Sequence, residues 1–299
     1  MNKNIVLRHQ LSDFVEKILQ QKIQADLEIK EFLPEYGGDI NTSFKIITTH
    51  GDFFMKTNDA LLYPGMFRKE AKGLETIRLT ETIYVPETIQ VGKLDNVAFL
   101  ILEYIEKGRN KDNRFWETFG QQLAEMHRHT NQYYGFDTDN YIGTLVQSNQ
   151  KDSSWVNFFI EQRLKPQIRL ATNRKKFDKK ILSKFEKLFT KLYQFLPDEL
   201  PHLLHGDLWS GNFLTSAQGF PVLIDPAVYY GHREMDLAMT KLFGGFDNRF
   251  YEAYNEAFPL LSGWQERVPI YQLYPLLVHV NLFGGSYIHS VNKILDRYI

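Results

Sequence analysis

The sequence predicts an α+β protein of two lobes, a small β-rich N-terminal lobe and a larger, mainly helical C-terminal lobe. In the first third of the chain, short segments rich in aromatic and β-branched residues alternate with turns, which is typical of strands. Beyond it, apolar residues mostly recur at helical spacing. We place the change at residues 103–108, which predicts lobes over 1–105 and 106–299.

The composition excludes several classes of protein. The chain has no cysteine, which rules out disulfides, thiolate nucleophiles, thiolate zinc sites and iron–sulfur clusters. Its 35 basic and 36 acidic residues give no electrostatic reason to expect nucleic acid as a partner. Residues 1–13 do not resemble a secretory signal, and the apolar segment 273–285 is too short to span a bilayer. We therefore expect a cytoplasmic protein with no membrane partner, and a monomer by default.

The N-terminal lobe should contain two helices and five strands, of which the first two form a hairpin. Gly51 lies between two β-type segments, and the apolar residues Phe67, Ala71 and Leu74 share one side of a helix. The expected elements are a helix over 11–27, a turn over 36–41, hairpin strands over 44–49 and 53–56, a helix after Pro64-Gly65, and strands over 83–86, 88–93 and 97–102.

The C-terminal lobe should be built mainly from helices. Asp112 is a suitable N-cap for the first of them, and Pro166 should bend or restart another. The expected elements are helices over 113–130, 154–168, 177–196, 234–243, 248–257 and 269–298, with a loop over 133–149. The many lysines of 177–196 are not interleaved with aromatic residues on their exposed side, so a solvated helix face explains them better than nucleic acid does.

One stretch carries the pattern of a catalytic loop, His205-Gly-Asp-Leu-Trp-Ser-Gly-Asn212. The segments 213–215 and 220–224 should form a hairpin, which would bring Asn212 and Asp225 to neighbouring strand ends. Amide and carboxylate oxygens suit Mg²⁺ that also binds phosphate, and Asp207 could accept a proton from a substrate hydroxyl. A turn and a strand end would explain single residues of these types, but not the whole pattern.

The N-terminal lobe supplies parts that match. Lys56, late in a hairpin strand, could pair with phosphates, and Glu70 on the next helix could hold its ammonium group. Alone, each would be an ordinary exposed residue, but their order along the chain favours the functional interpretation. Gly37-Gly38 precedes a strand and fits a loop whose backbone N–H groups approach phosphate, although a glycine pair at a turn is equally common without a ligand.

Several segments together resemble the fructosamine kinase (ketosamine 3-kinase) family, within the protein-kinase-like superfamily of aminoglycoside and choline phosphotransferases. Besides the catalytic stretch, they are Asp225-Pro-Ala227, Gly231-His-Arg-Glu-Met-Asp-Leu-Ala-Met239, Leu242-Phe-Gly-Gly-Phe246 and Asn281-Leu-Phe-Gly-Gly-Ser-Tyr287. The resemblance covers essentially the whole chain. It implies ATP, Mg²⁺ and phosphorylation of a ketosamine at the sugar 3-hydroxyl, after which phosphate is eliminated and the amine is released, which is deglycation.

The resemblance also implies a role for each matching position. Asp207 looks like the catalytic base, and Asn212 and Asp225 look like the metal ligands. The cofactor-binding positions are the phosphate-binding pair Lys56 and Glu70, Gly38 of the glycine-containing loop, and an adenine-reading hinge of Glu103, Tyr104 and Ile105. Asp236 resembles the buried carboxylate that braces the catalytic loop, although an aspartate near a helix start is also an ordinary cap.

Some roles stay open at this point. Trp209 could stack against the substrate or pack into the large lobe, and His232 and Arg233 could meet phosphate or serve the fold. His127 lies on the apolar side of its helix and is expected to be a core residue. Relatives often place a cysteine in the loop that holds Asp39 here, so redox control through such a thiol is absent.

Two other functions remain possible. One is a kinase of another hydroxylated amine, such as an aminoglycoside or a choline-like alcohol. The other is a pseudokinase that binds nucleotide and acts through a partner. Against it stands the presence of all four residues Lys56, Asp207, Asn212 and Asp225. The sequence leaves open whether a ketosamine substrate derives from fructose, ribulose or erythrulose, and whether it is free or bound to protein.

Overall fold

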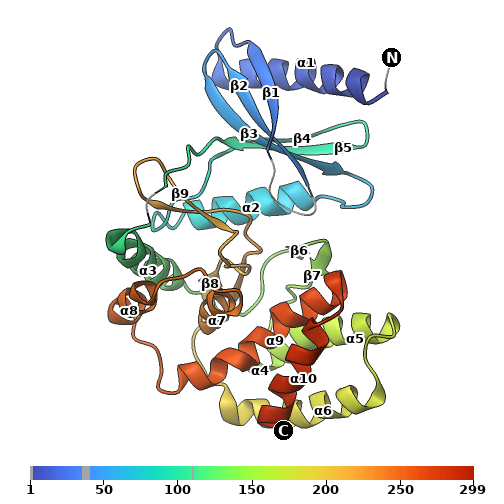
Figure 1. Ribbon diagram of the computed structural model, residues 1–299, viewed down its shortest axis with the longest axis vertical. Coiled ribbons are helices and arrows are strands. Elements are labelled where there is room, and N and C mark those ends of the chain that lie inside the picture. Colours follow the sequence, from blue (N-terminus) through green and yellow to red (C-terminus); the bar gives the residue numbers. More distant parts are fainter. Residues whose placement is uncertain (1–2, 36–40, 110) are drawn as a thin grey trace.

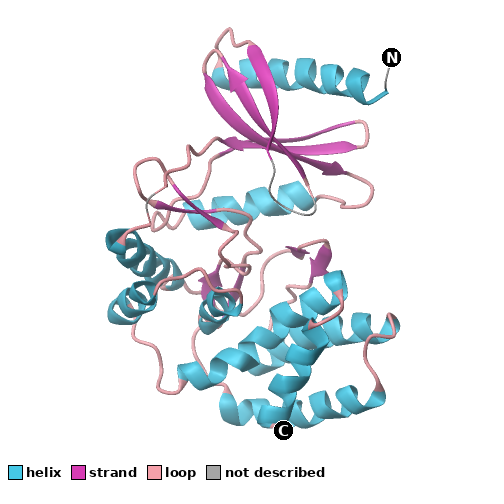
Figure 2. Cartoon of the chain, in the orientation of Figure 1, coloured by secondary structure: helices cyan, strands magenta, loops and turns pink. Residues whose placement is uncertain are grey.

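The computed structural model describes residues 3–35, 41–109 and 111–299, and its strands and helices separate as expected. Figure 2 shows the longest strands at one end of the molecule and most helices at the other. The N-terminal end holds a five-stranded antiparallel sheet of order β1-β2-β3-β5-β4. Its strands are β1 (Ile29–Glu35), β2 (Thr42–Thr48), β3 (Gly51–Asp59), β4 (Thr88–Leu94) and β5 (Val97–Glu103).

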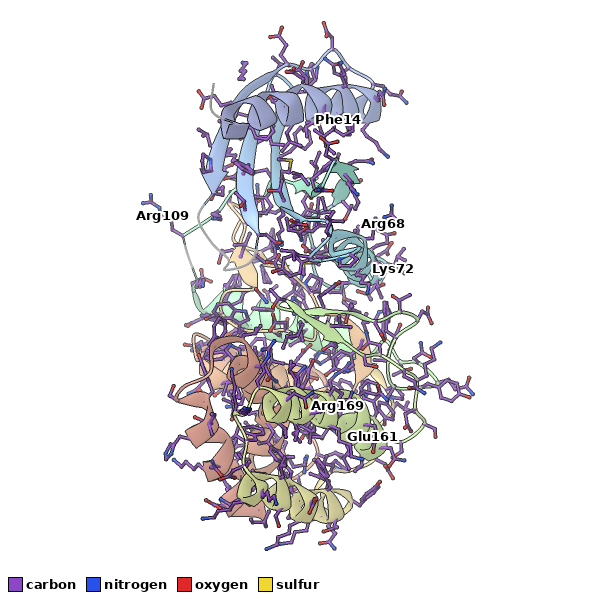
Figure 3. All side chains as sticks on the ribbon, turned by 90° about the vertical axis from the view of Figure 1, so that its right-hand side faces the viewer. Phe14, Arg68, Lys72, Arg109, Glu161 and Arg169 are labelled. Atoms are coloured by element: carbon purple, nitrogen blue, oxygen red, sulfur yellow. The ribbon has the colours of Figure 1, made fainter. Side chains whose placement is uncertain are left out.

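Two helices cover the two faces of this sheet. Helix α1 (Lys3–Ile23) lies on one face, and α2 (Met66–Arg78) lies on the other, towards the helical end (Figure 1). The Phe14 side chain lies on the side of α1 that faces the sheet, and its ring centroid is 6.1 Å from that of Phe99 (Figure 3). Because both faces are covered, β5 is an uninterrupted apolar run rather than an alternating one.

The remainder of the described chain is mainly helical, with three two-stranded sheets. Its helices are α3 (Asn113–His127), α4 (Trp155–Phe158), the π-helical η1 (Phe159–Leu164), α5 (Lys165–Asn173), α6 (Lys179–Phe195), α7 (Glu234–Leu242), α8 (Asn248–Ala257), α9 (Trp264–Phe283) and α10 (Tyr287–Tyr298). Its strands are β6 (Asn140–Ile142), β7 (Leu145–Gln147), β8 (His202–Leu204), β9 (Phe213–Thr215), β10 (Pro221–Leu223) and β11 (Tyr229–Gly231), which pair as β6–β7, β8–β11 and β9–β10. Over the described residues, none of the helices has the length and apolar character needed to cross a bilayer.

Most predicted elements are present. The β2–β3 hairpin, α2 and the β9–β10 hairpin form as expected, with Phe213 opposite Leu223 in the last of these. Asp112 caps α3, since its side chain accepts a hydrogen bond of 2.9 Å from the backbone N–H of Phe115. The predicted bend near Pro166 takes the form of the π-helical segment, and this proline falls in the first turn of α5.

Other predictions were wrong. The first helix starts earlier than residue 11 and ends at Ile23, so a strand, β1, follows where none was expected. Residues 83–86 are not a strand, because only Tyr84 forms an isolated bridge, with Val222. The expected loop 133–149 contains the β6–β7 hairpin. The expected single helix 269–298 is two helices, separated where Gly284 and Gly285 adopt positive φ.

The segment that follows β5 is attached to the β9–β10 hairpin. The backbone N–H of Gly108 donates to Thr215, and that of Ala217 donates to Glu106, both at 2.8 Å. A Cβ on Gly108 would lie 2.2 Å from the Ser216 carbonyl oxygen, so this close approach requires glycine. These contacts fix the strand that carries Glu103 relative to the hairpin. The division at residue 105 itself stays a prediction.

A buried ion pair joins α7 to α9. Arg267 donates to both carboxylate oxygens of Glu234, at 2.8 and 2.5 Å, and the two side chains are only 10% and 1% exposed. We expect Arg267→Met to lower the free energy of unfolding by about 3–5 kcal/mol, because Glu234 would stay buried without its cation. Urea denaturation followed by circular dichroism measures the change.

The matched control is an exposed pair of the same kind. Arg249 and Glu117 lie 3.0 Å apart with side chains 46% and 47% exposed. Arg249→Met should therefore cost only about 0–1 kcal/mol. Equal losses in the two variants would show that burial does not set the strength of the Arg267–Glu234 pair.

Candidate active site

The segment between β8 and β9 is held by a carboxylate from α7. Asp236 accepts hydrogen bonds from the backbone N–H groups of His205, at 2.7 Å, and of Gly206, at 2.9 Å. Gly206 has a φ of +82°, and a Cβ there would lie 2.2 Å from the carbonyl oxygen of Ala227. The conformation therefore requires glycine. Asp236, which is 1% exposed, braces the loop and is not the N-cap of its helix, which is Arg233.

The His205 ring links this loop to the end of β10. Its Nδ1 accepts a hydrogen bond of 3.2 Å from the backbone N–H of Asp207, so Nε2 carries the proton and donates to the carbonyl of Ile224 at 2.9 Å. Burial lowers the pKa of His205, which keeps the ring neutral in this role. The loop and the hairpin are thereby fixed to each other.

Asp207 and Asn212 are in direct contact. The Asn212 side-chain amide donates to the backbone carbonyl of Asp207 at 2.8 Å and to its carboxylate at 2.9 Å. Burial raises the pKa of Asp207 to about 7, although the hydrogen bond from Asn212 acts to lower it. The negative charges of Asp225 and Asp236 raise it further. A cation bound nearby would act in the opposite direction and favour the carboxylate.

Three charged residues from distant parts of the chain meet above this loop. The ammonium group of Lys56, on β3, contacts Glu70 of α2 at 2.8 Å and also contacts the carboxylate of Asp225. Burial lowers the pKa of Lys56, but attraction to Asp225 and Glu70 outweighs this effect, so its pKa is raised. Lys56 is only 4% exposed and is a fixed, charged group.

The residues fit a hard cation shared with phosphate. The Asn212 amide nitrogen is used on Asp207, which leaves its oxygen free to bind a metal. Asp225 follows β10 with a φ of +56°, and its side chain is 41% exposed. Among the residues described, no group of three or more histidine and acidic side chains could hold a metal. Two protein oxygens, completed by phosphate and water, are the usual ligands of Mg²⁺ in phosphoryl transfer.

A cleft of about 1030 Å³ connects these groups with the sheet. The strand β5 and the segment after it contribute Glu103, Tyr104 and Ile105 to its lining. The carboxylate of Glu103 accepts the Tyr84 hydroxyl at 2.7 and 2.8 Å, and its backbone N–H donates to Glu87. The cleft is at the upper end of the size range of small-molecule sites, with room for a nucleotide and an acceptor.

Trp209 lies on the wall of this cleft rather than in the core of the helical lobe. It is 38% exposed, and its ring centroid is 6.0 Å from that of Phe243. His127, by contrast, is fully buried and contacts Tyr254 at 2.8 Å and Asp236 at 3.2 Å, as expected of a core residue.

His232 and Arg233 serve the fold. Both are buried, and Arg233 pairs with Glu199 at 2.7 Å, while the His232 ring packs on Tyr271 with centroids 5.3 Å apart. The predicted contributions of Gly38 and Asp39 lie outside the described residues.

Sequence reasoning missed two groups of residues that line the cleft. Tyr141 and Thr144 belong to the β6–β7 hairpin, which was expected to be loop, and no periodic pattern marks strands of three residues. Phe243 and Phe283 also line it. Their signal was available, because the tetrapeptide Leu-Phe-Gly-Gly occurs at both 242–245 and 282–285.

Comparisons with known proteins agree with this arrangement. A family model described as "Fructosamine kinase" matches residues 11–299. A "Probable ketoamine kinase" of Enterococcus faecium is 40% identical over 281 residues, covering 93% of this chain and 99% of the relative. The "Protein-ribulosamine 3-kinase, chloroplastic" of Arabidopsis thaliana is 39% identical, covering 88% of this chain and 81% of the relative.

Solved structures share the fold. The crystal structure of a "Putative fructosamine-3-kinase" from Haemophilus somnus has a TM-score of 0.86 and 30% identity, covering 95% of this chain and 96% of that one. A thermostable mutant of the aminoglycoside phosphotransferase APH(4)-Ia has a TM-score of 0.60 at 14% identity, covering 94% of this chain and 98% of that one, a likeness of fold alone. The α+β, protein-kinase-like fold is therefore confirmed. On these matches the chain belongs to the fructosamine kinase family, and it is an ATP-dependent phosphotransferase.

Proposed function

We propose that this enzyme phosphorylates ketosamines at the sugar 3-hydroxyl, and that the product then eliminates phosphate and releases the amine. The observation that carries the proposal is the meeting of Lys56, Asp207, Asn212 and Asp225 in one cleft. The names of relatives that are about 40% identical, a ketoamine kinase and a ribulosamine 3-kinase, support this substrate class.

The N-terminal side of the cleft binds the nucleotide in this proposal. The backbone of Glu103, Tyr104 and Ile105 reads adenine. Lys56 then holds the phosphates, and Glu70, 2.8 Å from its ammonium group, keeps it in position. In the free protein Asp225 also contacts Lys56, so this carboxylate would exchange part of that contact for the cation that accompanies the phosphates.

The oxygens of Asn212 and Asp225 would hold Mg²⁺. Bound there, the ion would neutralise negative charge that develops on the phosphates. The hydrogen bonds of Asn212 to Asp207 keep its free oxygen directed away from that residue. The left-handed conformation of Asp225 sets the direction of its carboxylate at the end of β10.

Asp207 orients the acceptor hydroxyl and takes its proton. The bond between the 3-oxygen and the γ-phosphorus forms as the bond from that phosphorus to the β–γ bridging oxygen breaks, which releases ADP. Asp236 acts through the loop, because its carboxylate holds the backbone of His205 and Gly206. Positioning and electrostatics supply most of the acceleration in such transfers.

The proposal is tested by ATP consumption with a panel of acceptors. Fructosamines, ribulosamines and erythrulosamines should accelerate it, and NMR should place the phosphate on the 3-oxygen. Acceleration by aminoglycosides or choline alone would identify a kinase of another hydroxylated amine. Binding of ATP without turnover of any acceptor would identify a pseudokinase. The cytoplasmic location and the monomeric state stay predictions.

A further inference from the structure

Five aromatic rings form a continuous surface that begins beside the catalytic loop. This aromatic wall consists of Trp209, Phe243, His279, Phe283 and Tyr287, all of which line the cleft. Ring centroids are 6.0 Å apart from Trp209 to Phe243 and 4.9 Å from Phe243 to His279. From His279 they are 5.4 Å to Phe283 and 5.0 Å to Tyr287. The rings are close enough to one another to act as one surface.

The wall is built from the ends of two helices with the same tetrapeptide. Leu-Phe-Gly-Gly at 242–245 ends α7, and its copy at 282–285 ends α9. All four glycines have positive φ, between 62° and 89°, so the chain turns away immediately after each phenylalanine. Phe243 and Phe283 thus remain at the cleft, with His279 between them.

Three rings of the wall are partly exposed to solvent. Trp209 is 38% exposed, Phe243 39% and Phe283 57%. Single exposed aromatic residues need no explanation, but adjoining ones inside a cleft are typical of a binding surface.

The wall carries little charge. The lining residues that α7, α9 and α10 supply include one acidic residue among those described, Asp236, and its carboxylate is used by the backbone of His205 and Gly206. His279 donates from Nδ1 to the Pro275 carbonyl at 2.8 Å, and burial lowers its pKa, so the ring is neutral. A polycationic acceptor would find no free carboxylate on this side of the cleft.

We infer that the aromatic wall binds the amine substituent of the ketosamine and favours apolar and aromatic amines. The inference rests on the proposed function, since it assigns a place to one part of that substrate. Asp207 and Trp209 are two residues apart, so a sugar whose 3-hydroxyl is at Asp207 has its amine-bearing C1, two carbons away, within reach of the wall. A protonated amine is attracted by ring faces, and an apolar substituent gains contact area there.

The test compares two ketosamines that share a sugar and differ only in the amine, benzylamine or methylamine. For the unchanged enzyme, kcat/KM should be about tenfold higher with the benzylamine derivative, the value of one favourable ring contact. Phe283→Ala should remove most of this preference while leaving the methylamine derivative and the KM for ATP nearly unchanged. Phe283→Trp, which keeps a ring, should retain it.

Phe220→Ala is the matched control, because Phe220 is 53% exposed, close to the 57% of Phe283, and is not among the residues that line the cleft. The Phe220→Ala variant should keep the preference for the benzylamine derivative. Equal kcat/KM for the two derivatives with the unchanged enzyme would overturn this inference but leave the proposed function intact. An equal loss on both derivatives in Phe283→Ala would also overturn it, since the ring would then act on something other than the amine. Turnover of neither derivative, with ATP still bound, would instead refute the proposed function, and the inference would fall with it.

Discussion

Replacing Asp207 with asparagine is expected to lower kcat by about 10²–10⁴-fold, the contribution typical of a positioned general base. Asparagine keeps the shape of the side chain and can still accept the 2.9 Å hydrogen bond from Asn212, so the loop should keep its conformation. It cannot take a proton from the acceptor hydroxyl. Single-turnover kinetics with a ketosamine acceptor measures the loss, and equilibrium titration with ATP should show little change in affinity.

The control for this variant removes a carboxylate elsewhere. Asp137 is 75% exposed, pairs with Lys151 at the surface and does not line the cleft. Asp137→Asn should keep full activity. If Asp207→Asn kept it as well, the hydroxyl would lose its proton without help from this residue, and the role proposed for Asp207 would be wrong.

The catalytic loop could be predicted because its signals are local. From His205 to Asn212 the residues are contiguous, and the hairpin that follows obeys ordinary turn and strand patterns, so Asn212 and Asp225 could be expected at neighbouring strand ends. The contact of Lys56 with Glu70 could only be inferred from order along the chain. The structure places their charged atoms 2.8 Å apart, which fits the predicted pair, while its role towards phosphate stays a prediction.

The missed elements carry weak local signals. Strand β1 is an edge strand with a mixed, partly exposed pattern that includes two glutamates and Pro34. Charged residues and proline are what edge strands use against unwanted pairing, and they also hide a strand from a search for apolar alternation. The strands β8 and β11 have three residues each, too few to show a period.

Helix α9 begins earlier than the sequence predicts. The predicted range starts at Pro269, but the helix begins at Trp264 and contains both Pro269 and Pro275. Pro269 is the sixth residue of the helix and lies beyond its first turn, so it removes one backbone hydrogen bond, as Pro275 does. Pro275 is tolerated in a helix whose buried residues fix it against α7 and α5. The packing of α9 therefore outweighs the loss of backbone hydrogen bonds at its prolines.

The aromatic wall could not be predicted from spacing alone. Phe243 and Phe283 are 40 positions apart, and only the packing of α7 against α9 brings both rings to His279. The repeated Leu-Phe-Gly-Gly indicates two similar helix ends, but not that they converge. Convergence is a tertiary property, which is why the aromatic wall, to which we assign the amine substituent, was the least predictable part of the cleft.

Asp225→Asn should reduce kcat/KM by about 10²–10³-fold, as expected when the ion that stabilises charge on the transferring phosphate loses its charged ligand. The variant separates charge from conformation. Asp225 has a φ of +56°, which asparagine adopts more readily than most residues, so the backbone at the end of β10 should stay in place. The Mg²⁺ concentration that gives half-maximal activity should rise, because a neutral amide oxygen binds the ion more weakly than a carboxylate.

Asp225→Ala serves as the comparison for backbone strain. Alanine also lacks the charge, but it tolerates a left-handed conformation poorly, at a cost of about 1–2 kcal/mol. Thermal denaturation should therefore show Asp225→Ala to be less stable than Asp225→Asn, and because alanine offers no oxygen to the ion, Asp225→Ala should lose at least as much activity and Mg²⁺ affinity. If Asp225→Asn instead kept the Mg²⁺ dependence of the unchanged enzyme, the carboxylate would not be a metal ligand, and its contact with Lys56 would be its main role.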